Sequence, residues 1–371
     1  MDTNGGPLRV LMVFTILNRG GAETMVMNYF RKMDCRKVVF DFMVFRPQRG
    51  AYDDEVQRLG GRIFRLPPLK PGGVAKHRRA VREFFAMHPE YEAVHGHCSE
   101  LGYFVYREAR RQGLKFIAAH AHNKPRGWDL KTPAREVLKR LMRRHLTEFF
   151  TCSADSAKWL FGQRLAERAR FLPNAIDSGA FAHDPAAGEA VKRREGWSDR
   201  FVVGHVGRFS HQKNHMFLIR VFERVMSHDS SALLVLAGSG GEMEERVRKM
   251  VERKKLSENV AFAGSRTDIP DLLGAMDVFL FPSRFEGLSV AMLEAQAAGL
   301  RIVNSTLLSQ QGVVIPELVT SLAGWNANEW AARVLESRGA PRGDHREEII
   351  AAGFDINNNA QWLQELYLGQ R

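Results

Sequence analysis

The sequence of 371 residues has few cysteines and no long apolar run. The three cysteines, Cys35, Cys98 and Cys152, are widely spaced and form no CxxC pair. This spacing argues against a disulfide framework or a structural zinc site built on cysteine, and it fits a reducing compartment. The first residues are polar and show no signal peptide, and no apolar run approaches the length of a membrane span. We therefore expect a cytoplasmic protein.

Acidic residues are in deficit, because 42 aspartates and glutamates stand against 54 lysines and arginines, a formal net charge of +12. This charge suggests an anionic partner: nucleic acid, an anionic membrane surface or a phosphorylated substrate. No zinc finger, RRM aromatic motif or KH loop is present, so a nucleic-acid partner is not expected. The length suggests two domains, and the hydrophobic content of 44% is ordinary for soluble globular proteins.

One stretch combines a strand, a tight loop, a helix and a second strand. The apolar run 277–281 is of strand type. From Ser289 the apolar spacing is helical up to Gly299, a residue typical of a helix C-terminus, and 300–304 has the pattern of the next strand. The loop 286–289 thus leads into a helix N-terminus, whose free N–H groups and dipole favour a phosphate.

The residue types of this loop and helix suit a nucleotide-sugar. Gly287, followed by Leu288, has no Cβ, so a ligand can come close to the backbone. Glu286 and Glu294 would repel a bare phosphate, but they can accept hydrogen bonds from hydroxyl groups attached to it. A nucleotide-sugar has both parts, a diphosphate for the helix end and sugar and ribose hydroxyls for the carboxylates.

A second stretch supplies fixed positive charge. The strand-like run 201–206 is followed by Arg208 and Lys213, and then by a helix from about Met216. Two cations in the loop after a strand could neutralise a diphosphate leaving group, as a metal ion would. We therefore expect no metal and no other cofactor.

Histidines gather at the ends of two predicted strands. One strand ends with His95 and His97, and the next, over 115–123, carries His120 and His122. Ligands of open parallel sheets lie at the carboxyl ends of strands, and alternate residues of a strand share a face. Metal ligation is not expected, since no carboxylate or cysteine lies at ligand spacing. Hydrogen-bonded histidines without a catalytic role are the alternative, which we favour for the first pair.

A glycine turn follows the first predicted strand. The apolar run 8–14 leads into Asn-Arg-Gly-Gly-Ala-Glu and then an amphipathic helix, the opening of a Rossmann-type unit. The turn is not GxGxxG, so dinucleotide binding is not indicated. Gly20 and Gly21 lie at the helix N-terminus, where they could close over a phosphate or form a purely structural turn.

The phrase Pro-Ser-x-x-Glu-Gly-Leu…Leu-Glu-Ala-x-Ala-x-Gly over 282–299 resembles the signature of glycosyltransferase family 4, the retaining enzymes of GT-B fold. The family's Gly-Arg…Lys-Asn pattern stands at 207–214. Its Pro-Asn-Gly-Ile-Asp motif is similar to 173–177, where Ala175 replaces the usual glycine. The resemblance extends over essentially the full length.

The resemblance implies an α/β protein of GT-B fold, with two Rossmann-like domains facing across a cleft. We expect an acceptor-binding domain over 1–185 and a nucleotide-sugar-binding domain over 186–371. The last helix, at about 356–368, is expected to cross back and pack on the first domain.

The family's site residues fall on positions already singled out. By resemblance, Glu286 contacts the donor sugar and Glu294 the ribose, while Arg208 and Lys213 carry the diphosphate charge. Backbone near Arg266 is expected to read the nucleobase.

In the family, a histidine after the strand over 115–123 lines the cleft near the donor sugar and acceptor. This position falls on His122, followed by Asn123, with His120 as the alternative. His97 matches a second, weaker position of the family.

The implied activity is retaining transfer of a sugar from a nucleotide-sugar, UDP-linked by preference, to a glycan acceptor that is lipid-linked. The match is most similar to bacterial exopolysaccharide or capsule transferases. An epimerase or hydrolase of the same fold, or a non-enzymatic carbohydrate-binding protein, is the alternative.

A basic run over 135–144 adds a further expectation. Its apolar residues recur at helical spacing, so it could form a basic amphipathic helix on anionic lipid at the inner face of the plasma membrane. A solvated, charged helix face packed on its own sheet is the equal alternative.

Overall fold

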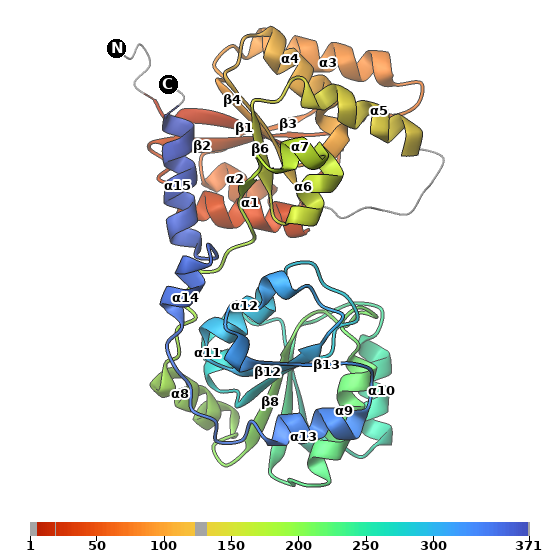
Figure 1. The fold of residues 1–371 in the computed structure, drawn as a ribbon, viewed down its shortest axis with the longest axis vertical. Helices are drawn as coiled ribbons and strands as arrows, with labels where there is room; N and C mark the ends of the chain where they lie inside the picture. Colours follow the sequence, from red (N-terminus) through yellow and green to blue (C-terminus); the bar gives the residue numbers. More distant parts are fainter. Residues whose placement is uncertain (1–5, 19, 123–131, 370–371) are drawn as a thin grey trace. The chain divides into compact units, whose positions relative to one another are not determined.

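The computed structural model describes residues 6–18, 20–122 and 132–369. The chain forms two compact units, unit 1 over Met1–Ala175 and Ile356–Arg371 and unit 2 over Ile176–Asp355 (Figure 1). The chain therefore passes from unit 1 to unit 2 at Ile176, before the domain boundary expected near 185. Ile176 pairs with Asp355 in a parallel bridge and packs in an apolar cluster with Leu293 and Phe354, which ties it to unit 2.

Unit 1 is built on a seven-stranded parallel sheet in the order β3-β2-β1-β4-β5-β6-β7. The strands are β1 (Leu8–Phe14), β2 (Val38–Val44), β3 (Ile63–Arg65), β4 (Ala93–Gly96), β5 (Phe116–Ala121), β6 (Glu148–Thr151) and β7 (Arg170–Phe171). The helices are α1 (Gly21–Lys32), α2 (Asp53–Arg58), α3 (Val74–Met87), α4 (Tyr103–Arg111), α5 (Thr132–Arg143), α6 (Ala154–Phe161), α7 (Gln163–Ala166) and α15 (Ile356–Leu368).

The central strands of unit 1 are buried on both faces, which explains their near-continuous apolar sequences. Along β1, Val10 and Met12 pack into one core with residues of α1 and α15. Leu11 and Val13 point the other way, into the core that α3, α4 and α6 share with the sheet. The last helix, α15, belongs to unit 1, where the buried Tyr367 packs beside β1 and β2.

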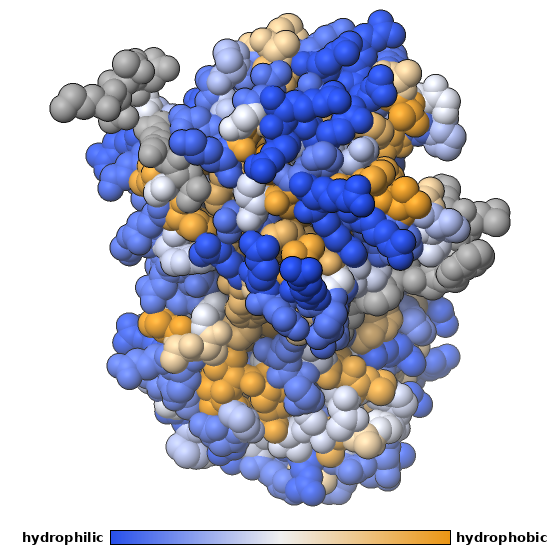
Figure 2. Space-filling view, turned by 45° about the horizontal axis from the view of Figure 1, so that its top comes forward, coloured by the Kyte–Doolittle hydropathy of each residue, from blue (hydrophilic) through white to orange (hydrophobic). Residues whose placement is uncertain are grey.

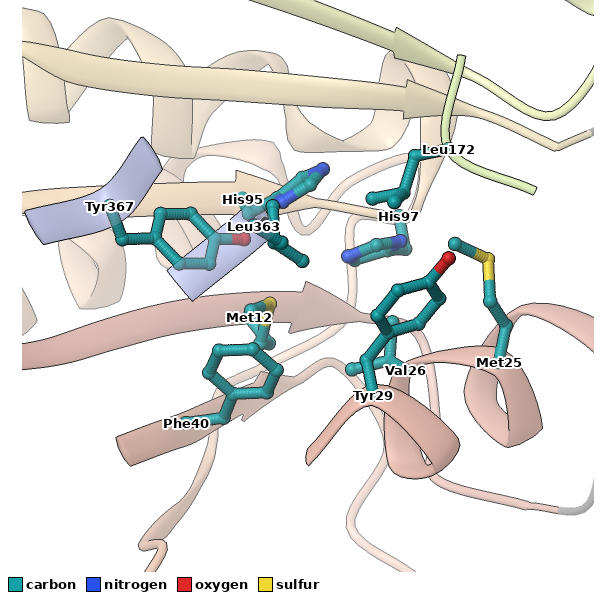
Figure 3. A pocket seen from close by; sticks show the side chains of 10 residues that line it. All are labelled: Met12, Met25, Val26, Tyr29, Phe40, His95, His97, Leu172, Leu363 and Tyr367. Carbon is teal, nitrogen blue, oxygen red and sulfur yellow. Dashed lines mark hydrogen bonds between the residues drawn. The ribbon is translucent and has the colours of Figure 1, made fainter. Parts of the chain in front are cut away.

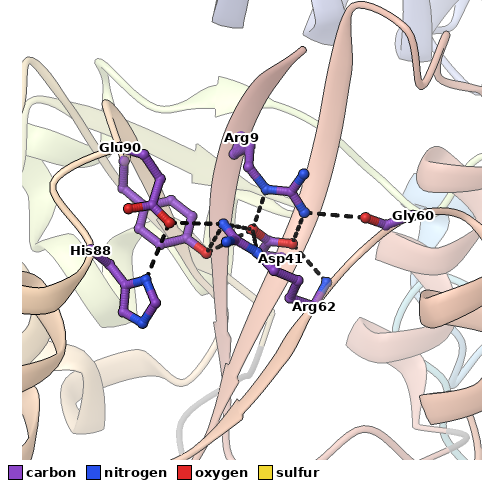
Figure 4. Close-up of polar contacts among 7 residues, drawn as sticks. Arg9, Asp41, Gly60, Arg62, His88 and Glu90 are labelled. Carbon is purple, nitrogen blue, oxygen red and sulfur yellow. Dashed lines mark hydrogen bonds and ion pairs between the residues drawn. The ribbon is translucent and has the colours of Figure 1, made fainter. Parts of the chain in front are cut away.

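One buried carboxylate interrupts the apolar pattern of β2. Asp41 is fully buried and accepts hydrogen bonds from Arg9 (2.6 and 2.7 Å), Arg62 (2.7 to 3.0 Å) and Tyr91 (2.6 Å) (Figure 4). Burial alone would raise the pKa of Asp41, but the hydrogen bonds from Arg9, Arg62 and Tyr91 outweigh it and hold the pKa below its usual range. Asp41 therefore joins β1, β2 and the chain before β3 as an anion.

Unit 2 is built on a six-stranded parallel sheet in the order β10-β9-β8-β11-β12-β13. The strands are β8 (Phe201–Val206), β9 (Ala232–Ala237), β10 (Val260–Gly264), β11 (Val278–Phe281), β12 (Arg301–Ser305) and β13 (Val319–Leu322). The helices are α8 (Pro185–Glu195), α9 (His215–Met226), α10 (Glu244–Arg253), α11 (Ile269–Gly274), α12 (Val290–Ala297), α13 (Ala327–Leu335) and α14 (Arg346–Ala351). Two apolar cores cover the two faces of this sheet.

In unit 2 the strand order reverses between β8 and β11. In open α/β sheets of this kind, ligands bind at the carboxyl ends of the strands beside such a reversal. The loops that follow β8 and β11 are therefore the place to look for a site.

Replacing Asp41 by Asn is expected to destabilise unit 1, because two arginines lose a buried anionic partner. Breaking such a pair costs about 3–5 kcal/mol. Urea unfolding followed by circular dichroism measures the loss. As a control, Asp54→Asn breaks an exposed pair with Arg49 and should cost about 1 kcal/mol or less. Equal losses in the two variants would show that the buried network is not a main support of unit 1.

Candidate functional site

The predicted strand, loop, helix and strand are present as β11, a loop over 282–289, α12 and β12. Ser289 is the N-cap of α12 and has extended backbone, and no side chain caps this helix end. The space where Gly287 would carry a Cβ is open. The first N–H groups of α12 therefore remain available to an anion.

Three of the predicted charged groups come together at this helix end. The Lys213 ammonium lies 2.9 Å from Oε1 of Glu286, in an ion pair without hydrogen-bond alignment, and it also lies 4.5 Å from the centre of the Phe281 ring. Burial raises the pKa of Glu294 to about 7, and the charge of Lys213 acts in the opposite direction. One ammonium thus interacts with both carboxylates of the motif.

The loop after β8 and the loop after β11 are joined through main-chain atoms. Arg284 N donates to the carbonyl oxygen of Gln212 (2.8 Å), and Gln212 Nε2 donates to the carbonyl oxygen of Phe285 (2.9 Å). The Arg284 side chain donates to Oδ1 of Asn214 (3.1 Å), the left-handed residue that caps α9. These bonds fix the backbone on either side of Lys213 and Glu286, and sequence reasoning did not anticipate them.

Two other predicted donor-site residues of unit 2 have different surroundings. Arg208 is exposed, and its guanidinium has no hydrogen-bond or ion-pair partner among the residues that the structure describes. Arg266 is engaged by Asp268 (2.6 and 2.7 Å) and Glu195 (3.2 Å). The Arg266 side chain is therefore held within unit 2, and a nucleobase contact with the backbone near Arg266 stays a prediction.

In unit 1, Gly20 caps α1 and Gly21 begins it. The carboxylate of Glu23 folds back onto this helix end, so that a Cβ on Gly20 would lie 2.3 Å from its Oε2. Burial raises the pKa of Glu23, and a backbone hydrogen bond opposes the rise. This end of α1 is thus covered by the chain's own carboxyl group, which favours the structural interpretation of the glycine turn.

The four strand-end histidines form one cluster in unit 1, in which His95, His97 and His120 are buried and His122 is half-buried. His97 Nδ1 lies 2.8 Å from His122 Nε2, and the rings of His120 and His122 stack with centres 4.1 Å apart. Burial lowers the pKa of His122 to about 4 and that of His95 to about 3, so both rings are neutral at pH 7. Asn123, predicted beside His122, lies outside the described residues.

Nitrogen atoms of His95, His97 and His120 lie within 4.8 Å of one another. The sequence analysis expected no metal because no carboxylate or cysteine lies at ligand spacing, and that expectation stays a prediction. The approach of three histidines from two strands was not foreseen, although the i, i+2 spacing of His95 and His97 placed two of them on one face.

Comparison with known proteins shows which family the chain resembles. Residues 200–337 match the family "Glycosyl transferases group 1", and residues 20–175 match the family "Glycosyl transferase 4-like domain". The chain is 36% identical over 377 residues to EpsF of Bacillus subtilis, a protein named as a glycosyltransferase, with 98% of this chain and 97% of EpsF covered.

The chain belongs to glycosyltransferase family 4. It is also 21% identical over 383 residues to the capsular polysaccharide biosynthesis glycosyltransferase CapH of Staphylococcus aureus, with 98% of this chain and 99% of CapH covered. Its fold is similar to that of Anabaena HepE, crystallised in complex with UDP, at a TM-score of 0.79 and 18% identity, with 98% of this chain and all of HepE covered.

These findings confirm that the fold is GT-B and that the protein is a glycosyltransferase. The non-enzymatic interpretation is therefore excluded. Within the described residues, no helix is long and apolar enough to cross a membrane.

Glu294 should make nucleotide affinity depend on pH near neutrality. Above its pKa of about 7 the carboxylate is a strong acceptor for ribose hydroxyls, so UDP should bind up to about tenfold more tightly at pH 8 than at pH 6. Calorimetry with UDP measures this. Glu294→Gln should flatten the profile relative to wild type, whereas Glu286→Gln should keep it. A profile unchanged in Glu294→Gln would rule out this carboxylate as the titrating group.

Proposed function

We propose that this glycosyltransferase moves a hexosyl or N-acetylhexosaminyl group from a UDP-sugar to a lipid-linked glycan, with retention of configuration, in exopolysaccharide or capsule synthesis. The observation that carries the proposal is the grouping of Lys213, Glu286 and Glu294 at the uncapped end of α12. The names of CapH and of UDP-bound HepE support the polysaccharide product and the UDP donor.

Each group at the α12 end has a distinct task in this proposal. Lys213 and Arg208 take up the negative charge that develops on the departing diphosphate, and the N–H groups of α12 add to this. Glu286 accepts hydrogen bonds from the donor sugar, and Glu294 accepts them from the ribose. The Lys213–Glu286 ion pair keeps both side chains oriented until the donor separates them.

The bond changes balance without an added reactant. The bond from the anomeric carbon to the diphosphate oxygen breaks, and its electron pair leaves with the diphosphate. The acceptor oxygen forms the new bond on the same face of the sugar, and its proton passes to an oxygen of the leaving diphosphate. His122, neutral at pH 7, can hydrogen-bond a sugar hydroxyl but cannot supply a fixed positive charge.

A donor and acceptor assay tests the proposal. The protein is incubated with UDP- and GDP-sugars that carry a radioactive label, with and without a lipid-linked glycan acceptor. Labelled glycan whose new linkage keeps the anomeric configuration of the donor supports the proposal. An isomerised donor would point to an epimerase and a free sugar to a hydrolase, and either outcome without labelled glycan contradicts transfer.

Charge stabilisation by side chains should make the donor site independent of Mg²⁺ and Mn²⁺. Lys213→Met and Arg208→Gln should each lower kcat by about 100-fold, the usual effect of removing one group that stabilises transition-state charge. The control Lys249→Gln alters an exposed pair on α10 and should leave the rate unchanged. A rate that rises strongly on addition of Mg²⁺ or Mn²⁺ would contradict this mechanism.

A basic surface on unit 1 supports a membrane-bound acceptor. Helices α3, α4 and α5 lie side by side, and strongly hydrophilic residues spread over this part of unit 1 (Figure 2). Its exposed cations are Lys76, Arg78, Arg79, Arg82, Arg110, Arg111, Lys115, Arg140 and Arg144. We propose that this surface binds anionic lipid electrostatically.

The structure changes which residues of α5 can take part. Met142 is fully buried in the core of unit 1, so this part of the apolar side is not available to lipid. Lys139 is also buried, and Arg143 donates to the carbonyl oxygen of Leu160 (2.8 and 3.0 Å). The exposed Arg140 and Arg144 remain for lipid.

Arg140→Gln with Arg144→Gln should weaken binding to phosphatidylserine vesicles by up to about thirtyfold at low salt, since each cation contributes about 1 kcal/mol. Co-sedimentation measures this, and binding should fall as salt rises. Lys249→Gln with Arg253→Gln, on exposed positions of unit 2, is the matched control. Unchanged binding by the α5 variant would remove this helix from the membrane surface.

A further inference from the structure

The histidine cluster of unit 1 places three imidazoles on one face of two paired strands. β4 and β5 are parallel neighbours with His95 opposite Ala118 and Gly96 opposite Ala119. His95 and His97 are two residues apart on the β4 side, and His120 lies on β5 next to them. Their ring centres are 4.6 Å (95–97), 5.3 Å (97–120) and 5.5 Å (95–120) apart.

Two of these three rings are oriented by hydrogen bonds to residues outside the triad of His95, His97 and His120. His95 Nδ1 lies 2.7 Å from Oη of Tyr367 on α15, and His97 Nδ1 lies 2.8 Å from Nε2 of His122. His97 also stacks on Phe14, with the rings 3° from parallel. Side-chain contacts from β1, β5 and α15 therefore hold the two rings so that their Nε2 atoms remain for another partner.

Two of the inward nitrogens have no partner of their own. Nε2 of His95 and Nε2 of His97 are buried without a hydrogen bond among the described residues, and the ring nitrogens of His120 are buried beside them, with the backbone of Leu172 as a weak partner. Leaving a buried polar group unsatisfied is unfavourable. Several buried ring nitrogens gather at one point here, and a cation bound between them would satisfy them together.

We propose that His95, His97 and His120 bind a zinc ion inside unit 1. Three histidine nitrogens are an established zinc donor set, and Zn²⁺ prefers neutral imidazole over the oxygen ligands that Mg²⁺ requires. Bonds of about 2.1 Å place tetrahedral ligand nitrogens about 3.4 Å apart. The three nitrogens lie within 4.8 Å, so small rotations of the rings close the site.

A small apolar cavity adjoins two of the three histidines. This cavity of about 10 Å³ is lined by His95 and His97 together with Met12, Tyr29 and Tyr367 (Figure 3). Because its lining is apolar, we assign no ligand to it, and the donor set of the proposed site consists of the three histidine nitrogens.

The ion would act on the transferase through His122. Coordination at Nε2 of His97 makes its Nδ1–H a stronger donor to Nε2 of His122 and so fixes the orientation of that ring. The zinc is thus a positioning element of unit 1, separate from the donor site of unit 2, where diphosphate charge is met by side chains.

Zinc binding can be measured without donor or acceptor, so its failure is distinguishable from failure of the proposed transfer. Untagged full-length protein is treated with a chelator, desalted and titrated with Zn²⁺ by calorimetry, and with Co²⁺ as a spectroscopic probe. We expect one ion per chain, a higher melting temperature with Zn²⁺, and the visible absorption of tetrahedral Co²⁺. The proposal is overturned if wild-type protein binds no Zn²⁺ when the free Zn²⁺ concentration is about 100-fold above a micromolar Kd.

Three variants locate the ion. His120→Gln should abolish binding, and Tyr367→Phe, which removes only the partner of His95 Nδ1, should weaken it by about tenfold. His77→Gln is the matched control, because His77 is buried in unit 1 but bonded to the Pro67 carbonyl oxygen outside the cluster. Equal binding by His120→Gln and His77→Gln would contradict the site. If His120→Gln does not fold, Tyr367→Phe takes its place, and equal Zn²⁺ binding by Tyr367→Phe and His77→Gln would contradict the site.

Discussion

The ion pair between Lys213 and Glu286 is the interaction on which the proposed donor site of unit 2 depends. It joins the loops after β8 and β11, the two strands between which the order of the unit 2 sheet reverses. Both side chains are largely buried, with 16% and 11% of their surfaces exposed, so water screens the pair little. In the proposed function, a diphosphate would replace Glu286 as the partner of Lys213, which would keep the ammonium paired and free the carboxylate for a sugar hydroxyl.

The two parallel sheets hold the loops at their strand ends in fixed positions, which the proposed change of partner at Lys213 requires. Parallel strands with both faces covered bury nearly every residue, so the loops at their carboxyl ends start from fixed points. In unit 2 the two loops are further linked by the bonds between Gln212 and residues 284–285. In unit 1, Asp41 and the histidines show that polar groups also lie within the layers, where each needs a partner.

The sequence predicted the parts of the fold and site that local pattern determines. Apolar runs gave the strands, and the Glu286–Gly299 segment placed both carboxylates and the helix end together. The bonds made by Gln212 and Asn214 were missed because hydrogen bonds between loops depend on the packing of distant segments. The same reason hid the Asp41 network, in which one aspartate in an apolar run meets arginines from two other segments. The helical spacing of the basic run is confirmed by α5, but spacing alone could not show that Met142 is buried in the core of unit 1 while Val137 is exposed.

The histidine cluster shows that residue spacing along the sequence predicts the place of a side chain but not its neighbours. Their positions at strand ends were predicted correctly, but their mutual approach was not, because spacing was considered along one strand at a time. Strand pairing is not encoded in the spacing of a single strand, so the approach of His120 to His95 and His97 emerges only in the folded unit.

A crystal structure of the protein with UDP tests the role of the Lys213–Glu286 pair most directly. We expect the diphosphate to lie between Lys213, Arg208 and the N-terminal end of α12. The ribose hydroxyls should contact Glu294, and the Lys213–Glu286 pair should be broken. A nucleotide bound at the α1 end beside Gly20, with the Lys213–Glu286 pair intact, would contradict it.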